Sequence, residues 1–346
     1  MKIGIPKETK TGEARVALTP EDCGALMKTG AALYLETTAG VGAGFSDQEY
    51  LRFGVEIVPD AASLYGQAQL IVKVKEPQTG DLALLTPEHH LFCYLHLAGG
   101  PELTQKMAAK KLTATAFETV RKGKSTPLLA PMSAIAGRLS VLWGSNFLHS
   151  SKGGKGVLLG GTIDHPQGEV LVLGGGVAGR EAAKIASSMG ARVRLLDINP
   201  LVLDSVNDQM PEVLTDLSDA DTIEKLLPGM DLVVGAVYQI GKKAPFVLSE
   251  AQIELVPKGA VLVDIAIDQG GCFATSKPCT QSEPYFIHKG IIHSAVTNMP
   301  AAVPRSASIA LSKAIHPYVL ELATGIISPE LAKGLNLDAG KLVIEL

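Results

Sequence analysis

The segment 169–197 restricts the fold of this chain more than any other. An apolar run, 169–173, leads directly into the glycine-rich stretch 174–179. A helical pattern then continues to Met189, and a second apolar run, 192–196, ends at Asp197. A strand, a glycine turn, a helix and a second strand in this order predict a βαβ unit with parallel strands.

Each glycine in this unit has a predicted mechanical role. Gly174 permits the tight turn out of the strand, Gly176 lets a pyrophosphate approach the backbone, and Gly179 lets the helix pack closely on the strand. The helix start at Val177 and Ala178 offers N–H groups and a positive dipole end to the phosphates. The segment therefore predicts a dinucleotide site, with FAD, SAM or no ligand as the alternatives.

Asp197 closes the second strand, where a carboxylate accepts hydrogen bonds from the adenosine ribose hydroxyls. Because a carboxylate also repels a 2′-phosphate, Asp197 favours NAD over NADP as the cofactor. Arg192 and Arg194 lie nearby in the sequence, so some use of NADP stays open.

Short apolar runs alternate with helical patterns along nearly all of the 346 residues, which is typical of α/β architecture. We predict two Rossmann-like domains with parallel sheets and a cleft between them. The first comprises 1–127 plus 302–346, and the second, which binds the dinucleotide, comprises 128–301. A long helix over 302–322 returns the chain to the first domain, although Pro317 should kink or break it. Further expected strands are 2–5, 33–36, 70–75, 91–95, 113–117, 231–237 and 260–266, and further helices are 20–29, 101–110 and 133–149.

Composition excludes several classes of protein. The net charge is −4 and no basic cluster occurs, so a nucleic-acid partner is not expected. No run of about 18 apolar residues predicts a membrane span, and no apolar stretch at the N-terminus predicts a signal peptide, so a cytoplasmic location is the default. The four cysteines form no C-x-x-C pair, and the histidines lack metal-site spacing, so we expect no metal.

Several residues outside the glycine unit are candidates for chemistry. His96 follows the expected strand 91–95, at the strand end where sites in α/β sheets gather, but a core histidine is the simpler interpretation. Lys73 and Lys75 share one side of an extended strand, so spacing does not choose between them. For Arg15 the simpler interpretation is a surface arginine. Asp268 follows the strand 260–266 and either faces a ligand or caps the turn after it.

These pieces together resemble the L-alanine dehydrogenase family over nearly the whole chain. The resemblance rests on the motifs Gly4-Ile5-Pro6-Lys7-Glu8, Glu13-Ala14-Arg15-Val16, Lys73-Val74-Lys75-Glu76-Pro77, Tyr94-Leu95-His96-Leu97-Ala98, Leu129-Ala130-Pro131-Met132-Ser133, Ala136-Gly137-Arg138, Val263-Asp264-Ile265-Ala266-Ile267-Asp268-Gln269-Gly270-Gly271-Cys272 and Asn298-Met299-Pro300. It implies reversible, NAD-dependent oxidative deamination of L-alanine to pyruvate and ammonium by a homo-oligomer, with a hexamer expected. Ala134 and Val202 depart from the family pattern at positions that affect cofactor affinity.

The resemblance also implies roles for single residues. His96 is the expected general acid/base, and Asp268 assists proton transfer or positions water and the nicotinamide ribose. The expected substrate residues are Arg15, Lys75, Tyr94, Glu118 and Met132, with Glu118 orienting Lys75. The expected cofactor residues are Ser133, Gly174, Gly176, Val177, Ala178, Gly179, Asp197, Val237, Ile267, Asp268, Asn298 and Met299.

Three other functions compete with alanine oxidation. A transhydrogenase-like NAD-binding subunit needs no amino-acid site, and a silent NAD-binding regulatory protein needs none either. The presence of Arg15, Lys75 and His96 together favours an enzyme over both. An opine- or saccharopine-type dehydrogenase, with a larger second substrate, is the nearer alternative.

Overall fold

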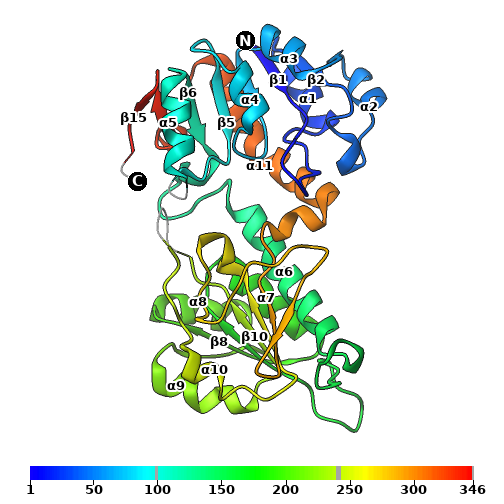
Figure 1. The fold of residues 1–346 in the computed structure, drawn as a ribbon, viewed down its shortest axis with the longest axis vertical. Helices are drawn as coiled ribbons and strands as arrows, with labels where there is room; N and C mark the ends of the chain where they lie inside the picture. Colours follow the sequence, from blue (N-terminus) through cyan, green and yellow to red (C-terminus); the bar gives the residue numbers. More distant parts are fainter. Residues whose placement is uncertain (98–99, 239–242, 345–346) are drawn as a thin grey trace. The chain divides into compact units, whose positions relative to one another are not determined.

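Contacts along the chain divide it into two units, Met1–Met132 with Ala301–Leu346, and Ser133–Pro300. A computed structural model describes residues 1–97, 100–238 and 243–344. Each unit is a mostly parallel sheet with interleaved helices, so the predicted α/β architecture is confirmed (Figure 1). The expected divisions at 127/128 and 301/302 compare with 132/133 and 300/301 in the structure.

Unit 1 is built on a sheet with the strand order β15-β14-β6-β5-β4-β1-β2-β3. Its strands are β1 (Lys2–Ile5), β2 (Ala32–Glu36), β3 (Glu56–Val58), β4 (Leu70–Val72), β5 (His90–Cys93), β6 (Thr113–Ala116), β14 (Leu335–Asp338) and β15 (Lys341–Leu342). Its helices are α1 (Pro20–Met27), α2 (Asp47–Leu51), α3 (Ala61–Gln67), α4 (Thr79–Leu84), α5 (Pro101–Ala109), α11 (Pro304–Thr324) and α12 (Pro329–Ala332).

The strands β1 to β6 run parallel, and the carboxyl ends of β4 and β5 lie side by side. The edge strands β14 and β15 run antiparallel, so the expectation of purely parallel sheets is wrong at this edge. Side chains of the central strand β4 are wholly buried, as expected of a sheet covered on both faces.

Two predictions about unit 1 need correction. The strand expected over 70–75 ends at Val72: the Lys73 N–H group still donates to the Phe92 carbonyl of β5 at 3.2 Å, but the N–H groups of Val74 and Lys75 bind the Glu8 carboxylate. Helix α11 returns the chain to unit 1 as predicted, but it runs through Pro317 without a break. Buried Ile315 and Val319 flank the proline, and their packing offsets the one lost hydrogen bond.

Unit 2 has the strand order β12-β13-β11-β10-β7-β8-β9, with only β12 antiparallel to its neighbour in the described residues. Its strands are β7 (Glu169–Leu173), β8 (Arg192–Asp197), β9 (Leu214–Leu217), β10 (Leu232–Gly235), β11 (Val261–Asp264), β12 (Phe286–His288) and β13 (Ile291–Ser294). Its helices are α7 (Val177–Ser188), α8 (Pro200–Gln209), α9 (Ala220–Leu226) and α10 (Glu250–Ile253), and α6 (Ala130–Phe147) enters it from unit 1.

The predicted βαβ unit is present as β7, α7 and β8. The strands β7 and β8 pair in parallel, with partners from Glu169–Arg192 to Leu173–Leu196.

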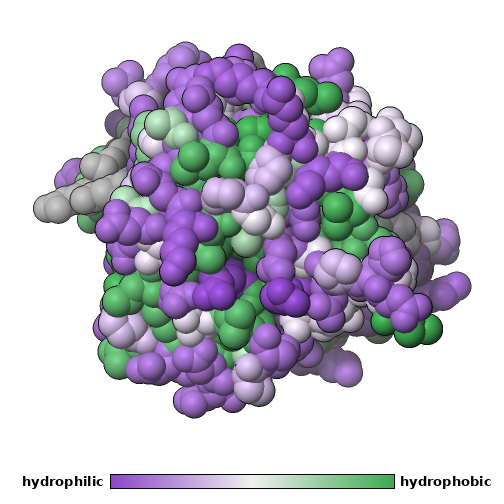
Figure 2. Space-filling model, turned by 90° about the horizontal axis from the view of Figure 1, so that it is seen from below, coloured by the Kyte–Doolittle hydropathy of each residue, from purple (hydrophilic) through white to green (hydrophobic). Residues whose placement is uncertain are grey.

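Apolar and polar side chains are interspersed on the face drawn in Figure 2. In the part of the chain that is described, no helix combines the length and apolarity needed to cross a membrane.

Candidate active site

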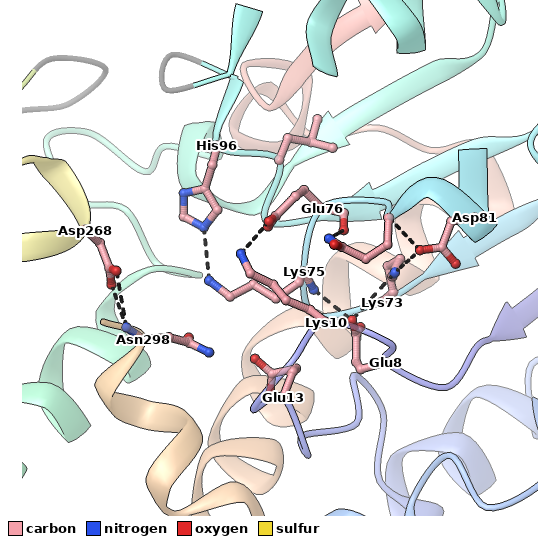
Figure 3. Close-up of polar contacts among 12 residues, drawn as sticks. Glu8, Lys10, Glu13, Lys73, Lys75, Glu76, Asp81, His96, Asp268 and Asn298 are labelled. Carbon is pink, nitrogen blue, oxygen red and sulfur yellow. Dashed lines mark hydrogen bonds and ion pairs between the residues drawn. The ribbon is translucent and has the colours of Figure 1, made fainter. Parts of the chain in front are cut away.

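Lys75 and His96 meet at the carboxyl ends of two neighbouring strands. Lys75 follows β4 and His96 follows β5, which pair in parallel. The Lys75 Nζ atom lies 3.4 Å from Nε2 of His96 (Figure 3). The His96 ring stacks on the Tyr94 ring, with 6.0 Å between centroids and 22° between planes. Strand pairing thus brings together two residues that lie 21 positions apart in the sequence.

The pKa of His96 is lowered to about 3 by desolvation and by the charge of Lys75, with a smaller effect from Arg15. The residue is nevertheless exposed to solvent, so its ring is accessible to a ligand. At neutral pH the imidazole is therefore uncharged. Its Nε2 accepts a hydrogen bond from the Lys75 ammonium, and it can take a proton from a substrate.

The His96 main chain is fixed by Glu118. Its φ is 51°, in the left-handed region that non-glycine residues rarely adopt. The Glu118 carboxylate accepts hydrogen bonds from the N–H groups of His96, at 2.6 Å, and Leu95, at 3.1 and 3.2 Å. Burial raises the pKa of Glu118, and these hydrogen bonds oppose the rise. Glu118 thus holds the backbone that presents the imidazole.

Arg15 is buried rather than on the surface, with 2% of its area exposed. Its Nε and Nη2 atoms donate to the Glu13 carboxylate at 2.7 and 2.5 Å, and its Nη1 donates to the Met132 sulfur at 3.0 Å. This forked ion pair fixes the guanidinium plane. Tyr94, whose hydroxyl donates to the carbonyl of Leu128 at 2.5 Å, is also buried.

The structure distinguishes the two lysines that spacing left equivalent. Lys73 is wholly buried, with its Nζ donating to Asp81 at 2.7 Å and lying 3.6 Å from Glu8. Lys75 is the lysine beside His96. Sequence reasoning did not single out Glu8 and Glu13, although both lie in motifs that carry the family resemblance.

The glycine turn of unit 2 has the geometry that its predicted roles require. Gly174 has a φ of 105°, and a Cβ there would lie 2.6 Å from the Ala236 carbonyl oxygen. A Cβ at Gly179 would lie 1.8 Å from the Gly174 carbonyl oxygen, so only glycine allows α7 to approach β7 this closely. Gly176, at the start of α7, is exposed and has open space where a Cβ would point.

A phosphate group fits this open space, because the 12-residue helix α7 begins there with its first N–H groups. Gly137 of α6 was not predicted as part of this region. A Cβ at Gly137 would lie 2.1 Å from the Ala178 carbonyl oxygen, so Gly137 permits α6 to pack against the start of α7.

Asp197 lies at the end of β8, beside the glycine turn. It accepts hydrogen bonds from the N–H groups of Gly175, at 2.7 Å, and Asn199, at 2.8 Å. Arg192 pairs with Glu169 at 2.9 Å, and Arg194 pairs with Asp216. The two arginines that could have attracted the 2′-phosphate of NADP are therefore both bound to carboxylates.

The two acids near the end of β11 have different surroundings. Asp264 is buried and accepts hydrogen bonds from the N–H groups of Ala266, Cys272 and Phe273, so it holds the turn after the strand. Asp268 binds the N–H group of Asn298 at 3.1 and 3.2 Å (Figure 3). The remaining expected cofactor residues vary in exposure: Ile267 and Met299 are buried, and Ser133 and Val237 are half-buried.

No group of His, Cys, Asp and Glu able to hold a metal occurs among the described residues.

Comparisons with known proteins agree over the full length of the chain. The family described as "Alanine dehydrogenase/PNT, N-terminal domain" matches residues 4–136, and "Alanine dehydrogenase/PNT, C-terminal domain" matches residues 140–345. The chain is 42% identical over 354 residues to an alanine dehydrogenase of Methanococcus maripaludis, covering all of this chain and 95% of that protein.

Two solved structures are also similar to this chain. One named L-alanine dehydrogenase matches with a TM-score of 0.95 and 43% identity, covering 99% of this chain and 97% of that one. A transhydrogenase from Sinorhizobium meliloti matches with a TM-score of 0.85 and 22% identity, covering 99% of both chains. The second likeness shows the fold alone.

Proposed function

The chain belongs to the alanine dehydrogenase/PNT family, and on this premise we propose that it catalyses the reversible, NAD-dependent oxidative deamination of L-alanine to pyruvate and ammonium. The family resemblance predicted from the sequence is confirmed, and a dehydrogenase of this family uses a nicotinamide cofactor. The pairing of Lys75 with the uncharged imidazole of His96 carries the proposal, because oxidation of an amino acid needs a cation beside a proton acceptor.

In this proposal Arg15 and Lys75 bind the substrate carboxylate. Glu13 fixes the orientation of the Arg15 guanidinium, and Met132 lies against the same group at 3.0 Å. Burial of the arginine strengthens its attraction for a carboxylate, because little water competes. Tyr94 packs beside His96 and forms the apolar side of the pocket.

His96 is the proposed general acid/base, held in place by Glu118 through the main chain. A bound nicotinamide would supply the acceptor for the hydride that leaves the substrate Cα. His96 then takes the proton from the water that attacks the resulting imine, and returns a proton as ammonium leaves. Lys75 stabilises the negative charge that develops on the substrate oxygen. Hydride transfer requires the substrate bound to unit 1 to meet the nicotinamide bound to unit 2. The cleft between the units in which they would meet stays a prediction.

We assign NAD to unit 2. The backbone at Gly176, Val177 and Ala178, of which Gly176 and Val177 are exposed and Ala178 is half-buried, would hold the pyrophosphate, and Asp197 would bind the ribose hydroxyls. The pairing of Arg192 and Arg194 with carboxylates supports NAD over NADP, because it leaves their charges partly neutralised. Asp268 and Asn298, which bind each other, would face the nicotinamide side together with Ser133, Val237, Ile267 and Met299.

The transhydrogenase-like alternative lacks support from a specific observation in unit 1. A chain that only passes hydride to a partner needs no buried arginine beside a lysine–histidine pair. An opine- or saccharopine-type dehydrogenase differs in needing room for a larger second substrate. The expected cytoplasmic location and hexameric assembly stay predictions.

The test is an NADH-formation screen across small L-amino acids, with NADP in place of NAD in a parallel series. We expect L-alanine to be oxidised best, and NAD to be much preferred. If none of the L-amino acids yields NADH, and hydride is exchanged between two nicotinamides, the transhydrogenase-like function would be supported instead. Oxidation of a large secondary amine in preference to L-alanine would support the opine-type function.

A further inference from the structure

Glu8 lies beneath the segment that carries Lys75. It follows β1, and 2% of its side chain is exposed. Its Oε1 atom accepts hydrogen bonds from the N–H groups of Val74, at 2.6 Å, and Lys75, at 3.3 Å (Figure 3). Because β4 ends at Val72, this carboxylate takes the place that a neighbouring strand would otherwise fill.

A buried ion pair fixes the other side of Glu8. Its Oε2 atom lies 3.6 Å from Nζ of Lys73 and has no hydrogen-bond partner in the described part of the chain. Lys73 in turn donates to Asp81 at 2.7 Å, and Asp81 accepts from the Tyr65 hydroxyl and the Gln78 N–H group, both at 2.8 Å. The position of Glu8 is thus set by α3, α4 and the end of β4 together.

We propose that Glu8 is a positioning residue for Lys75, whose main chain it fixes so that the ammonium group reaches Nε2 of His96. This inference rests on the proposed function, in which Lys75 holds the substrate carboxylate. A lysine side chain rotates freely about several bonds, so its aim depends on the backbone from which it starts. Without the carboxylate, the N–H groups of Val74 and Lys75 lose this acceptor, and the segment is held less tightly, through the Tyr94 N–H group that donates to the Val74 carbonyl at 3.1 Å.

The charge of Glu8 also changes near neutral pH. Burial raises its pKa to about 7, Lys73 lowers it, and Glu13 raises it. Further titratable groups around it are Arg15, Tyr65 and Cys93. An ionised carboxylate holds the two N–H groups more strongly than a neutral acid does. The aim of Lys75 should therefore improve as the pH rises through 7.

The test compares Glu8→Ala and Glu8→Gln in the full chain. Glu36→Gln is the matched control, because the Glu36 carboxylate accepts the N–H group of Lys7 at 2.9 Å, one residue before Glu8, rather than the N–H groups of Val74 and Lys75. We expect Glu8→Ala to lower kcat/KM for L-alanine by about 10- to 100-fold, as a misplaced catalytic group does. Glu8→Gln should lose less and should lack the pH dependence near 7, while NADH binding stays unchanged in both. Folded Glu8 variants with wild-type kcat/KM and pH profile would overturn the proposal.

A second measurement does not depend on activity. The Lys75 charge lowers the pKa of His96, so an NMR titration of the His96 ring reports the distance between them. We expect this pKa to rise in Glu8→Ala, to rise further in Lys75→Met, and to stay unchanged in Glu36→Gln. Loss of the Glu8 negative charge alone would lower it, so a rise reports movement of Lys75.

A wild-type titration curve in Glu8→Ala, with a shifted curve in Lys75→Met, would disprove the positioning role. If Glu8→Ala fails to fold, Glu8→Gln carries both measurements. If the wild-type chain does not oxidise L-alanine and the His96 shift still appears, the proposed function fails and the positioning role stands.

Discussion

The close contact between α7 and the end of β7 makes Gly179→Ala a severe test of the packing beneath the proposed dinucleotide site. The new Cβ would lie 1.8 Å from the Gly174 carbonyl oxygen, and an ordinary contact begins at 3.4 Å. The helix and the strand must therefore separate by about 1.6 Å. Both atoms are attached to the backbone, so no side-chain rotation relieves the clash.

Overpacking of this kind costs about 1–3 kcal/mol. The gain from alanine over glycine within a helix offsets up to about 1 kcal/mol, which leaves a net loss of about 2 kcal/mol at the upper end of that range, where a clash that no side-chain rotation relieves belongs. For a unit of this size, Tm should fall by about 4–8 °C. Because the start of α7 moves, the Kd for NAD should also rise.

Gly176→Ala is the matched substitution three residues earlier. Nothing lies within 4 Å of its Cβ, and its φ of −69° suits any residue. We expect Tm to stay close to that of the wild-type chain, while Kd for NAD rises at least about tenfold, because the Cβ occupies the space meant for the pyrophosphate. Gly66→Ala in α3, which also has open space around its Cβ, controls for the substitution itself and should change neither quantity for the worse.

Differential scanning calorimetry and NADH fluorescence titration measure the two quantities separately. An unchanged Tm in Gly179→Ala would refute the packing argument. Wild-type affinity in Gly176→Ala would refute the assignment of the phosphate position, whatever the result for Gly179.

Four further predictions concern single side chains. His96→Ala should lower kcat by about 10²- to 10⁴-fold and leave NADH affinity intact; unchanged turnover in steady-state assays would remove it from the mechanism. Arg15→Ala should raise KM for L-alanine, and urea unfolding should show a loss of about 3–5 kcal/mol because Glu13 stays buried without its ion-pair partner; an unaltered KM would reassign the carboxylate partner. Asp197→Ala should weaken binding of NAD more than of NADP in calorimetric titrations, and equal losses would contradict the ribose assignment. Burial raises the pKa of Glu8 from 4.5 to about 7, so its contribution to stability is present at low pH and is lost as the pH rises from 4.5 to about 7. In urea unfolding, the free energy of unfolding of the wild-type chain should fall relative to that of Glu8→Gln between about pH 4.5 and 7. A constant difference between the two chains would contradict this.

Much of the candidate site could be predicted from neighbouring residues. The turn at Gly174, the helix start at Gly176 and the close approach at Gly179 follow from glycine sterics within one short segment. The first helix likewise starts where Thr19 and Pro20 predict it, with the Thr19 side chain accepting the Asp22 N–H group. Such features depend on residues a few positions apart, so the sequence displays them directly.

The edge strands could not be predicted in the same way. The edge strands β3, β9, β12 and β15 are short, and β9 and β15 have no buried side chain, so they lack the continuous apolar pattern of central strands. The antiparallel direction of β14 depends on its pairing with β6, more than 200 residues earlier. Pairing between distant segments leaves no periodic signal in either one.

The sequence by itself determined the strand–turn–helix unit on which the predicted dinucleotide site rests, because the sterics of such a unit are local. It also supplied Arg15, Lys75 and His96 as candidates through the family motifs. Only the tertiary structure separated Lys75 from Lys73, joined Arg15 to Glu13, and placed Glu8 and Glu118 against the backbones of the proposed catalytic residues. The physical reason is that charge pairing and burial are set by neighbours in space, which strands far apart in the chain supply only when the sheet has formed.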